Sequence, residues 1–236
     1  MPRQLMVTSP KILDYFAYDD RDPVGNEVLV RTTVSGIKHG TELNHYRGQV
    51  PFEGQVWDPV LRLFRPLRDG ERSEPFFPHS LGSWAAGVVE MVGPDVTRFR
   101  VGDRVHGEWK HRETALMDEA ALYPIGADVE AETMLFTDPA RFALAGTHDA
   151  DIKLGDRVAV FGLGAIGLLV VQMARLSGAG EVLAVDPDAR RLGLARGFGA
   201  DAALNTLECD PGLAIKEATR GLGVDVAIEV SGVYAA

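Results

Sequence analysis

A glycine pattern in the second half of the chain constrains its fold more than any other feature of the sequence. The apolar run Val158–Phe161 leads into Gly-x-Gly-x-x-Gly, with glycines at Gly162, Gly164 and Gly167. An amphipathic stretch, Leu168–Leu176, follows directly. This order predicts a buried strand, a tight turn and a helix, because the glycines permit the turn and let the helix pack closely on the strand.

An acidic residue completes this pattern. A second apolar run, Val182–Val185, ends at Asp186, which lies 19 residues after Gly167. Strand, turn, helix, strand and carboxylate form the context in which such glycines bind a dinucleotide, with the pyrophosphate at the helix N-terminus and the acid on the ribose 2′-hydroxyl. A carboxylate also repels a 2′-phosphate, so the sequence favours NAD over NADP.

We therefore predict a coenzyme site at this turn. Its predicted residues are Gly162, Gly164, Ala165, Ile166, Gly167, Asp186 and Arg191. Arg190 and Arg191 keep NADP open as an alternative, because an arginine here can accept a 2′-phosphate. Asp186 has a second interpretation, in which it shapes the turn into the next helix together with Asp188.

Composition limits the classes of protein to which the chain can belong. The net charge of −10 argues against binding to nucleic acid or docking on an anionic membrane. No apolar run approaches the ~20 residues that span a bilayer. The single cysteine, Cys209, excludes an internal disulfide and a cysteine-cluster metal site. We predict a cytoplasmic protein whose partner is a small-molecule substrate.

The chain has two halves with different sequence patterns. In residues 1–135 short β signals such as Val28–Val34 and Val88–Val92 alternate with glycine and proline, which predicts a partly open β-barrel or sandwich. Asp138 before Pro139 predicts a helix N-cap. In residues 136–236 we expect an α/β fold with parallel strands near 158–161, 182–185, 202–204 and 224–230, and helices between the first three pairs.

The number of strands in the second half leads to a further interpretation. A dinucleotide-binding sheet ordinarily has six strands, and here the sequence stops after the fourth. We interpret the chain as a piece of a longer protein in which the half of the site that holds the nicotinamide is missing.

Several motifs together resemble one family. They are Ser35–Leu43, Leu81-Gly82 with Ala86–Val89, Val92–Val96 leading to Val101–Val105, Gly155–Gly167 and Asp225–Gly232. On these motifs the chain resembles the medium-chain dehydrogenase/reductase superfamily, the zinc-type alcohol dehydrogenases. The resemblance implies a GroES-like catalytic domain over residues 1–135 and an NAD(P)-binding Rossmann domain over 136–236. It also implies hydride transfer between NAD(P) and an alcohol, polyol or ketone, a role for Ser231 at the coenzyme, and a homo-oligomeric full-length protein.

The chain departs from this family at the expected zinc ligands. The family motif Gly-Ile-Cys-Gly-Thr-Asp places His39 where the cysteine ligand stands, and Gly-His-Glu is replaced by Gly82-Ser83-Trp84. Asp138 lies where polyol dehydrogenases of the family carry a glutamate ligand. Because a catalytic zinc needs about three protein ligands, we predict that a complete family-type zinc site is absent. His106 or His111 would otherwise have to complete it.

The same alignment nominates catalytic residues. Thr41 matches the threonine that relays the substrate proton in the family, whereas the histidine that ends this relay is Asn44 here. We expect His39 and Thr41 to be catalytic, with His39 stabilising the developing alkoxide as a hydrogen-bond donor or acid. His111 is a weaker candidate, and Glu42 is expected to organise the loop.

Two questions stay open at the level of sequence. The segment Gln49–Ser80 carries Trp57, Phe64, Phe76 and Phe77, which line a substrate pocket or pack as a subdomain against their own barrel. The main functional alternatives to an alcohol or polyol dehydrogenase are a zinc-free reductase of quinones or enones and a nucleotide-binding protein without catalysis.

Overall fold

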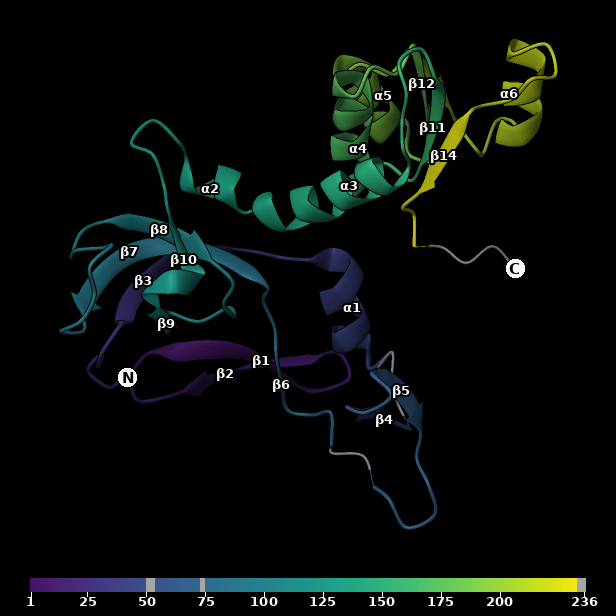
Figure 1. Cartoon of the computed structure of the whole chain (residues 1–236). Coiled ribbons are helices and arrows are strands. Elements are labelled where there is room, and N and C mark those ends of the chain that lie inside the picture. Colours follow the sequence, from purple (N-terminus) through teal and green to yellow (C-terminus); the bar gives the residue numbers. More distant parts are fainter. Residues whose placement is uncertain (50–53, 73–74, 233–236) are drawn as a thin grey trace. The chain divides into compact units, whose positions relative to one another are not determined.

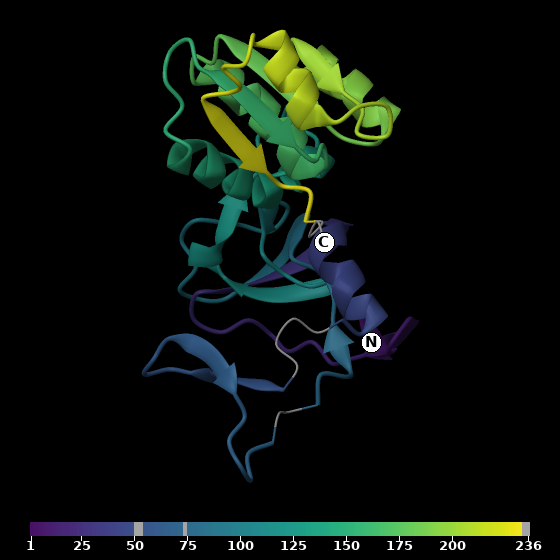
Figure 2. The ribbon, with the colours of Figure 1, turned by 90° about the vertical axis from the view of Figure 1, so that its right-hand side faces the viewer.

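The computed structural model describes residues 1–49, 54–72 and 75–232. Figures 1 and 2 show the whole chain, which divides into two compact units, Met1–Leu135 and Phe136–Ala236. In the described part of the chain, no helix is both long enough and apolar enough to cross a membrane.

An antiparallel five-stranded sheet forms the centre of the first unit. Its strand order is β10-β8-β7-β3-β9. The strands are β3 (Glu27–Gly36), β7 (Trp84–Val92), β8 (Arg104–Gly107), β9 (Thr114–Asp118) and β10 (Leu122–Pro124). Apolar side chains from all five strands bury a common core with Phe99 and Trp109. This sheet is the β architecture that the sequence of the first half predicts.

The strand β3 departs from a regular alternation of buried and exposed side chains. Val28 and Val30 are fully buried, as expected for alternate residues of a strand with one face toward a core, but Leu29 between them is also buried. Its pairing with β7 shifts register between Leu29 and Val30 and again between Thr32 and Val34. Such irregularities bend a strand and change the side of the sheet that a residue faces.

Shorter elements complete the first unit. They are β1 (Arg3–Ser9), β2 (Ile12–Ala17) and β6 (His79–Ser80) in a three-stranded sheet, the hairpin of β4 (Gln55–Asp58) and β5 (Leu63–Pro66), the helices α1 (His39–Arg47) and α2 (Ala131–Met134), and the 3₁₀ helix η1 (Glu119–Ala121). The segment from His111 to Glu113 connects the two larger sheets. Leu5 donates its N–H to the His111 carbonyl, and Thr32 donates to the Glu113 carbonyl.

A parallel four-stranded sheet forms the centre of the second unit, with the order β13-β12-β11-β14. The strands are β11 (Arg157–Phe161), β12 (Glu181–Val185), β13 (Ala202–Leu204) and β14 (Val226–Glu229), and the helices are α3 (Thr137–Asp149), α4 (Ala165–Leu176), α5 (Ala189–Gly197) and α6 (Pro211–Ala218). The predicted strands and connecting helices are confirmed, although β14 is shorter than the predicted strand over 224–230.

Helices cover both faces of this sheet (Figure 1). Val158, Val160 and Val182 pack against side chains of α3, α4 and α5. Ala159 and Leu183, which alternate with them along the same strands, pack against Ile215 of α6. Chain order along the sheet reverses between β11 and β14, and ligands of doubly wound folds bind beyond the carboxyl ends of the strands at such a point.

The helix α3 begins two residues earlier than the sequence predicts, at Thr137. Its N-cap is Phe136, whose side chain makes no capping hydrogen bond, and Asp138 lies in the first helical turn. The predicted N-cap at Asp138 is therefore wrong. Aspartate remains favourable in the first turn, because its negative charge interacts with the positive end of the helix dipole.

Candidate functional site

The turn after β11 is shaped by two glycines that no other residue can replace without a backbone shift. Gly162 has φ +89°, and a Cβ there would lie 2.5 Å from the Ser231 Cα. A Cβ on Gly167 would lie 1.8 Å from the Gly162 carbonyl oxygen. The first glycine thus lets the end of β14 approach the turn, and the second lets α4 start directly beside it.

The N-terminus of α4 opens onto this turn. Gly164 is the N-cap and provides no capping side chain, and Ala165 and Ile166 begin the helix. The first N–H groups of a helix lack intrahelical partners and carry the positive end of its dipole, so they bind an anion such as a pyrophosphate. The turn therefore has the local geometry that a dinucleotide requires.

Asp186 follows β12 and lies beside the same turn. Its side chain is 3% exposed, and its carboxylate accepts hydrogen bonds from the N–H of Leu163 at 2.7 Å and of Asp188 at 2.8 Å. The two bonds tie the glycine turn to the start of α5. Each carboxylate oxygen has a second lone pair, so the group can still accept a hydroxyl. Both interpretations of Asp186 are therefore compatible with its position.

The neighbouring arginines are paired with aspartates. Arg190 Nη2 lies 3.1 Å from Asp188 Oδ2, and Arg191 Nη1 lies 3.6 Å from Asp186 Oδ2. The Arg190 hydrogen bond lowers the pKa of Asp188 to about 2, and the Asp188 side chain also caps α5 by accepting from the Arg190 N–H. The exposed Arg190–Asp188 pair is weak, whereas the Arg191 guanidinium lies beside a nearly buried carboxylate.

In the first unit, the two predicted catalytic residues lie on the first turn of α1. His39 is its first residue and Thr41 its third, and both are exposed. The catalytic roles of His39 and Thr41 stay predictions.

Glu42, next in the same turn, is instead buried, with a side chain 7% exposed. Its Oε1 accepts the N–H of Lys38 at 2.8 Å, and its Oε2 lies 2.8 Å from His111 Nε2. Burial raises the pKa of this carboxyl, but the hydrogen bonds from His111, Lys38 and Gly82 outweigh burial and hold the pKa below its ordinary value. The expectation that Glu42 organises the loop agrees with these contacts.

His111 connects this helix to the strand before it. Its Nδ1 lies 2.8 Å from the Ser35 Oγ, and its side chain is 10% exposed. The backbone N–H of His111 donates to the Leu81 carbonyl, and a Cβ on Gly82, which has φ +104°, would lie 2.4 Å from the His111 nitrogen. The family motif that begins at Ser35 and the one that begins at Leu81 therefore both contact His111. The sequence indicates His111 as a candidate but does not predict that Glu42 is its partner, because Glu42 and His111 lie 69 positions apart.

Trp84 stands where the family carries the glutamate of Gly-His-Glu, and it has a buried polar partner. Its indole N–H donates to His106 Nδ1 at 3.1 Å. Both side chains are buried, and burial lowers the pKa of His106. The hydrogen bond uses the one polar atom of the indole and one ring nitrogen of the histidine.

Two of the remaining zinc candidates belong to different units. His39 belongs to the first unit and Asp138 to the second. Within residues 1–49, 54–72 and 75–232, no group of three histidine, cysteine, aspartate or glutamate side chains is arranged to hold a metal ion.

The aromatic residues of the segment 49–80 form two groups, and residues 50–53 and 73–74 of this segment lie outside the described part of the chain. Trp57 and Phe64 pair across the β4–β5 hairpin with ring centroids 5.2 Å apart. Phe76 stacks on His79 at 4.4 Å and meets His45 edge-on at 5.1 Å. The second group thus packs on α1, close to Glu42.

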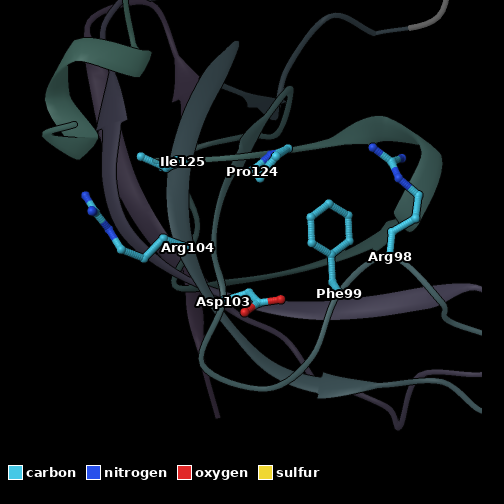
Figure 3. Close-up of a pocket in the computed structure, with 6 residues that line it drawn as sticks. All are labelled: Arg98, Phe99, Asp103, Arg104, Pro124 and Ile125. Atoms are coloured by element: carbon cyan, nitrogen blue, oxygen red, sulfur yellow. The ribbon is translucent and has the colours of Figure 1, made fainter. Parts of the chain in front are cut away.

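The pocket in Figure 3 lies elsewhere in the first unit and has a volume of about 250 Å³. It is lined by Arg98, Phe99, Asp103, Arg104, Pro124 and Ile125. The guanidinium groups of Arg98 and Arg104 donate to backbone carbonyls and point to opposite sides (Figure 3). It includes none of the predicted site residues.

Comparison with known proteins assigns the family. Residues 25–127 match the alcohol dehydrogenase GroES-like domain, and residues 165–236 match the zinc-binding dehydrogenase domain. D-guloside 3-dehydrogenase of Escherichia coli K12 is 36% identical over 234 residues, which are 98% of this chain and 67% of that protein. The chain belongs to the zinc-type medium-chain dehydrogenase/reductase superfamily.

Solved structures of this superfamily share the fold. The crystal structure of 2R,3R-butanediol dehydrogenase from Bacillus subtilis matches with a TM-score of 0.76 at 25% identity, over 99% of this chain and 71% of that chain. A dehydrogenase from Sinorhizobium meliloti 1021, solved with NADP bound, matches with a TM-score of 0.76 at 23% identity, over 99% of this chain and 70% of that chain. The predicted GroES-like and Rossmann domains are confirmed.

Proposed function

We propose that this chain is part of an NAD(P)-dependent oxidoreductase that transfers a hydride between the nicotinamide and an alcohol, polyol or ketone. One observation carries the proposal. Gly162, pressed against Ser231, places the open N-terminus of α4 beside the Asp186 carboxylate. These groups fit a dinucleotide, with the helix N-terminus for its pyrophosphate and the carboxylate for a ribose hydroxyl.

We further propose NAD rather than NADP as the coenzyme. A 2′-phosphate at this place would meet the buried negative charge of Asp186. The nearby cations Arg190 and Arg191 are paired with Asp188 and Asp186, so binding a phosphate would require that these pairs separate. The negative charge of Asp186 and the pairing of the two arginines therefore both disfavour NADP.

The relatives support a hydroxyl-bearing substrate. Two of them are named as dehydrogenases of a guloside and of a butanediol. We propose a polyhydroxy compound or secondary alcohol for this chain, with His39 and Thr41 at the reacting oxygen. A cation or hydrogen-bond donor must stabilise the alkoxide that forms, and an exposed imidazole at the start of α1 can do so without a complete family-type zinc site.

A titration of the full chain with NADH and with NADPH tests the coenzyme proposal. Asp186→Ser should weaken NADH binding and narrow the difference between the two coenzymes, since it removes the ribose acceptor and the repulsion together. Asp151→Ser, which removes an exposed aspartate of the same unit paired with Lys153, is the matched control and should change neither affinity. Preference of the unaltered protein for NADPH would refute the role of Asp186.

A zinc-free reductase of quinones or enones is the second candidate function. The buried Trp84–His106 hydrogen bond favours it, because this pair occupies the position of a glutamate that zinc-dependent members use. Turnover of alcohols with NAD⁺, measured beside turnover of quinones and enones with NADPH, separates the two candidates.

A further inference from the structure

Three side chains of the first unit form a hydrogen-bonded chain that the proposed function does not use. Ser35 Oγ lies 2.8 Å from His111 Nδ1, and His111 Nε2 lies 2.8 Å from Glu42 Oε2. Ser35 belongs to β3, Glu42 to α1, and His111 to the segment between β8 and β9. The histidine and the carboxylate are nearly buried, whereas Ser35 is partly exposed.

The direction of each hydrogen bond follows from the charge of Glu42. The carboxylate accepts N–H groups from Lys38 and Gly82 as well as His111, so it is ionised at neutral pH and only accepts. His111 must therefore donate from Nε2, and in the neutral form of the ring the lone pair then lies on Nδ1. Ser35 donates its hydroxyl proton to this lone pair. Serine, histidine and carboxylate then have the order of a proton-transfer triad.

We propose, on the basis of the proposed dehydrogenase function, that His111 is the group that takes the proton of the substrate alcohol, through the hydroxyl of Ser35. The alcohol O–H passes its proton to Ser35 Oγ while Ser35 passes its own proton to His111 Nδ1. The hydride leaves the carbinol carbon for the oxidised nicotinamide, and a carbonyl forms. The products are the ketone, the reduced coenzyme and an imidazolium that the Glu42 carboxylate stabilises. In the direction of reduction, the same protons return.

The residue at position 44 gives a chemical reason for this triad. The family histidine that ends the proton relay is Asn44 here, and an amide cannot store a proton. His111 can, because an anionic partner lies 2.8 Å away.

Lys110, His45 and His79 are the other charged and titratable groups near this triad. Burial, followed by the Lys110 charge, lowers the pKa of His45, and the Glu42 charge opposes this effect. Burial, followed by the His45 and Lys110 charges, lowers the pKa of His79. Both are therefore weaker bases than an exposed imidazole.

The first test is the steady-state oxidation, by the full-length protein, of a polyhydroxy compound or secondary alcohol that it turns over. Ser35→Ala should lower kcat by about 100-fold or more, the range for loss of a general acid–base group, with KM and NADH affinity little changed. Ser35→Thr keeps the hydroxyl and should restore most of kcat. Ser9→Ala, a partly exposed serine of β1, is the control. Equal kcat for Ser35→Ala and the unaltered protein would overturn the proposal while leaving the dehydrogenase function standing.

The pH profile and the ring nitrogens provide the second test. Glu42→Gln removes the anion that stabilises the imidazolium, so the acid limb of kcat should move to lower pH. Nitrogen NMR of histidine-labelled full chain should show a proton on Nε2 of His111 and none on Nδ1. A proton on Nδ1 would overturn the proposal even where no substrate is turned over. Absence of both coenzyme binding and turnover, with the Nε2 proton in place, would instead refute the dehydrogenase function.

Discussion

Gly162 and Ser231 lie so close together that a methyl group on the glycine would overlap the serine backbone, at 2.5 Å from its Cα and 2.6 Å from its nitrogen. The contact joins the carboxyl ends of β11 and β14, which are neighbouring parallel strands. It fixes the shape of the turn from which α4 starts.

Replacement of Gly162 by alanine should therefore destabilise the second unit. The new Cβ meets backbone atoms, and φ +89° is strained for any other residue, so we expect a loss of more than about 1 kcal/mol. Urea unfolding measures the loss, and NADH titration should show weakened binding. Gly193→Ala in α5 adds a Cβ that meets nothing within 4 Å, and should stabilise the helix by ~0.5–1 kcal/mol. Equal effects of the two substitutions would contradict this account.

The buried hydrogen bond from Trp84 predicts a second stability difference. Trp84→Phe keeps the aromatic ring but leaves His106 Nδ1 without its donor, at a cost of about 1–3 kcal/mol. Trp57→Phe is the control, because Trp57 is 49% exposed, and should change the free energy of unfolding by less than ~0.5 kcal/mol. The measurement is chemical denaturation followed by circular dichroism at neutral pH.

His106 also predicts a pH dependence. Burial holds its pKa below the ordinary value of 6.5, so below pH 6.5 the unfolded chain binds a proton that the folded chain does not. Stability should fall as the pH decreases through and below 6.5. His106→Gln should reduce this slope between pH 6.5 and 5, whereas the Trp57→Phe control, which alters no titratable group, should leave it unchanged. His45 and His79, whose pKa values burial also lowers, should account for part of the slope that remains. A slope of the same size in His106→Gln and in the unaltered protein would exclude His106 as a source.

Glu42 predicts a loss of stability in the same direction, at lower pH. Its pKa is held below the ordinary 4.5, so its contribution to stability is complete above pH 4.5 and is lost as the pH falls through the lowered value. Glu42→Gln should flatten the acid limb of the unfolding curve below pH 4.5. Glu132→Gln in α2 replaces an exposed carboxyl and serves as the control. An acid limb identical in both variants would exclude Glu42 as its source.

Metal content is the fifth expected outcome. Because Ser83 and Trp84 stand where the family carries ligands, purified protein should contain well under one zinc per chain. A chelator should leave the unfolding midpoint unchanged, whereas it would lower the midpoint of a protein that folds around its metal. Stoichiometric zinc that is lost in His39→Ala would reverse this prediction and restore Lewis-acid catalysis.

Local sequence signals predict the second unit well. The strands β11 to β13 and the glycine turn follow from short runs of residues, because parallel buried strands are continuously apolar and the turn requires glycine. The predicted N-cap at Asp138 failed, since the helix starts one residue before it. Helix starts are marked by weak local preferences, and a neighbouring residue can take the position.

The polar network of the first unit lies beyond such reasoning. Ser35 and Glu42 reach His111 across 76 and 69 positions, and Trp84 reaches His106 across 22. No periodicity links these residues; the antiparallel pairing of β7 with β8 brings the strands of Trp84 and His106 together. The sequence could nominate the histidines one by one but not their partners.

The indole–imidazole pair has a consequence for how this branch of the superfamily can change. A single substitution of Trp84 by glutamate buries a carboxylate beside a neutral histidine, and a single change of His106 strands the indole N–H. The change of His106 leaves a buried polar group unsatisfied, at a cost of about 1–3 kcal/mol. Trp84 and His106 should therefore change together during evolution. A change of His106 alone, on the way to a metal-ligating version of this site, would lower the stability of the fold.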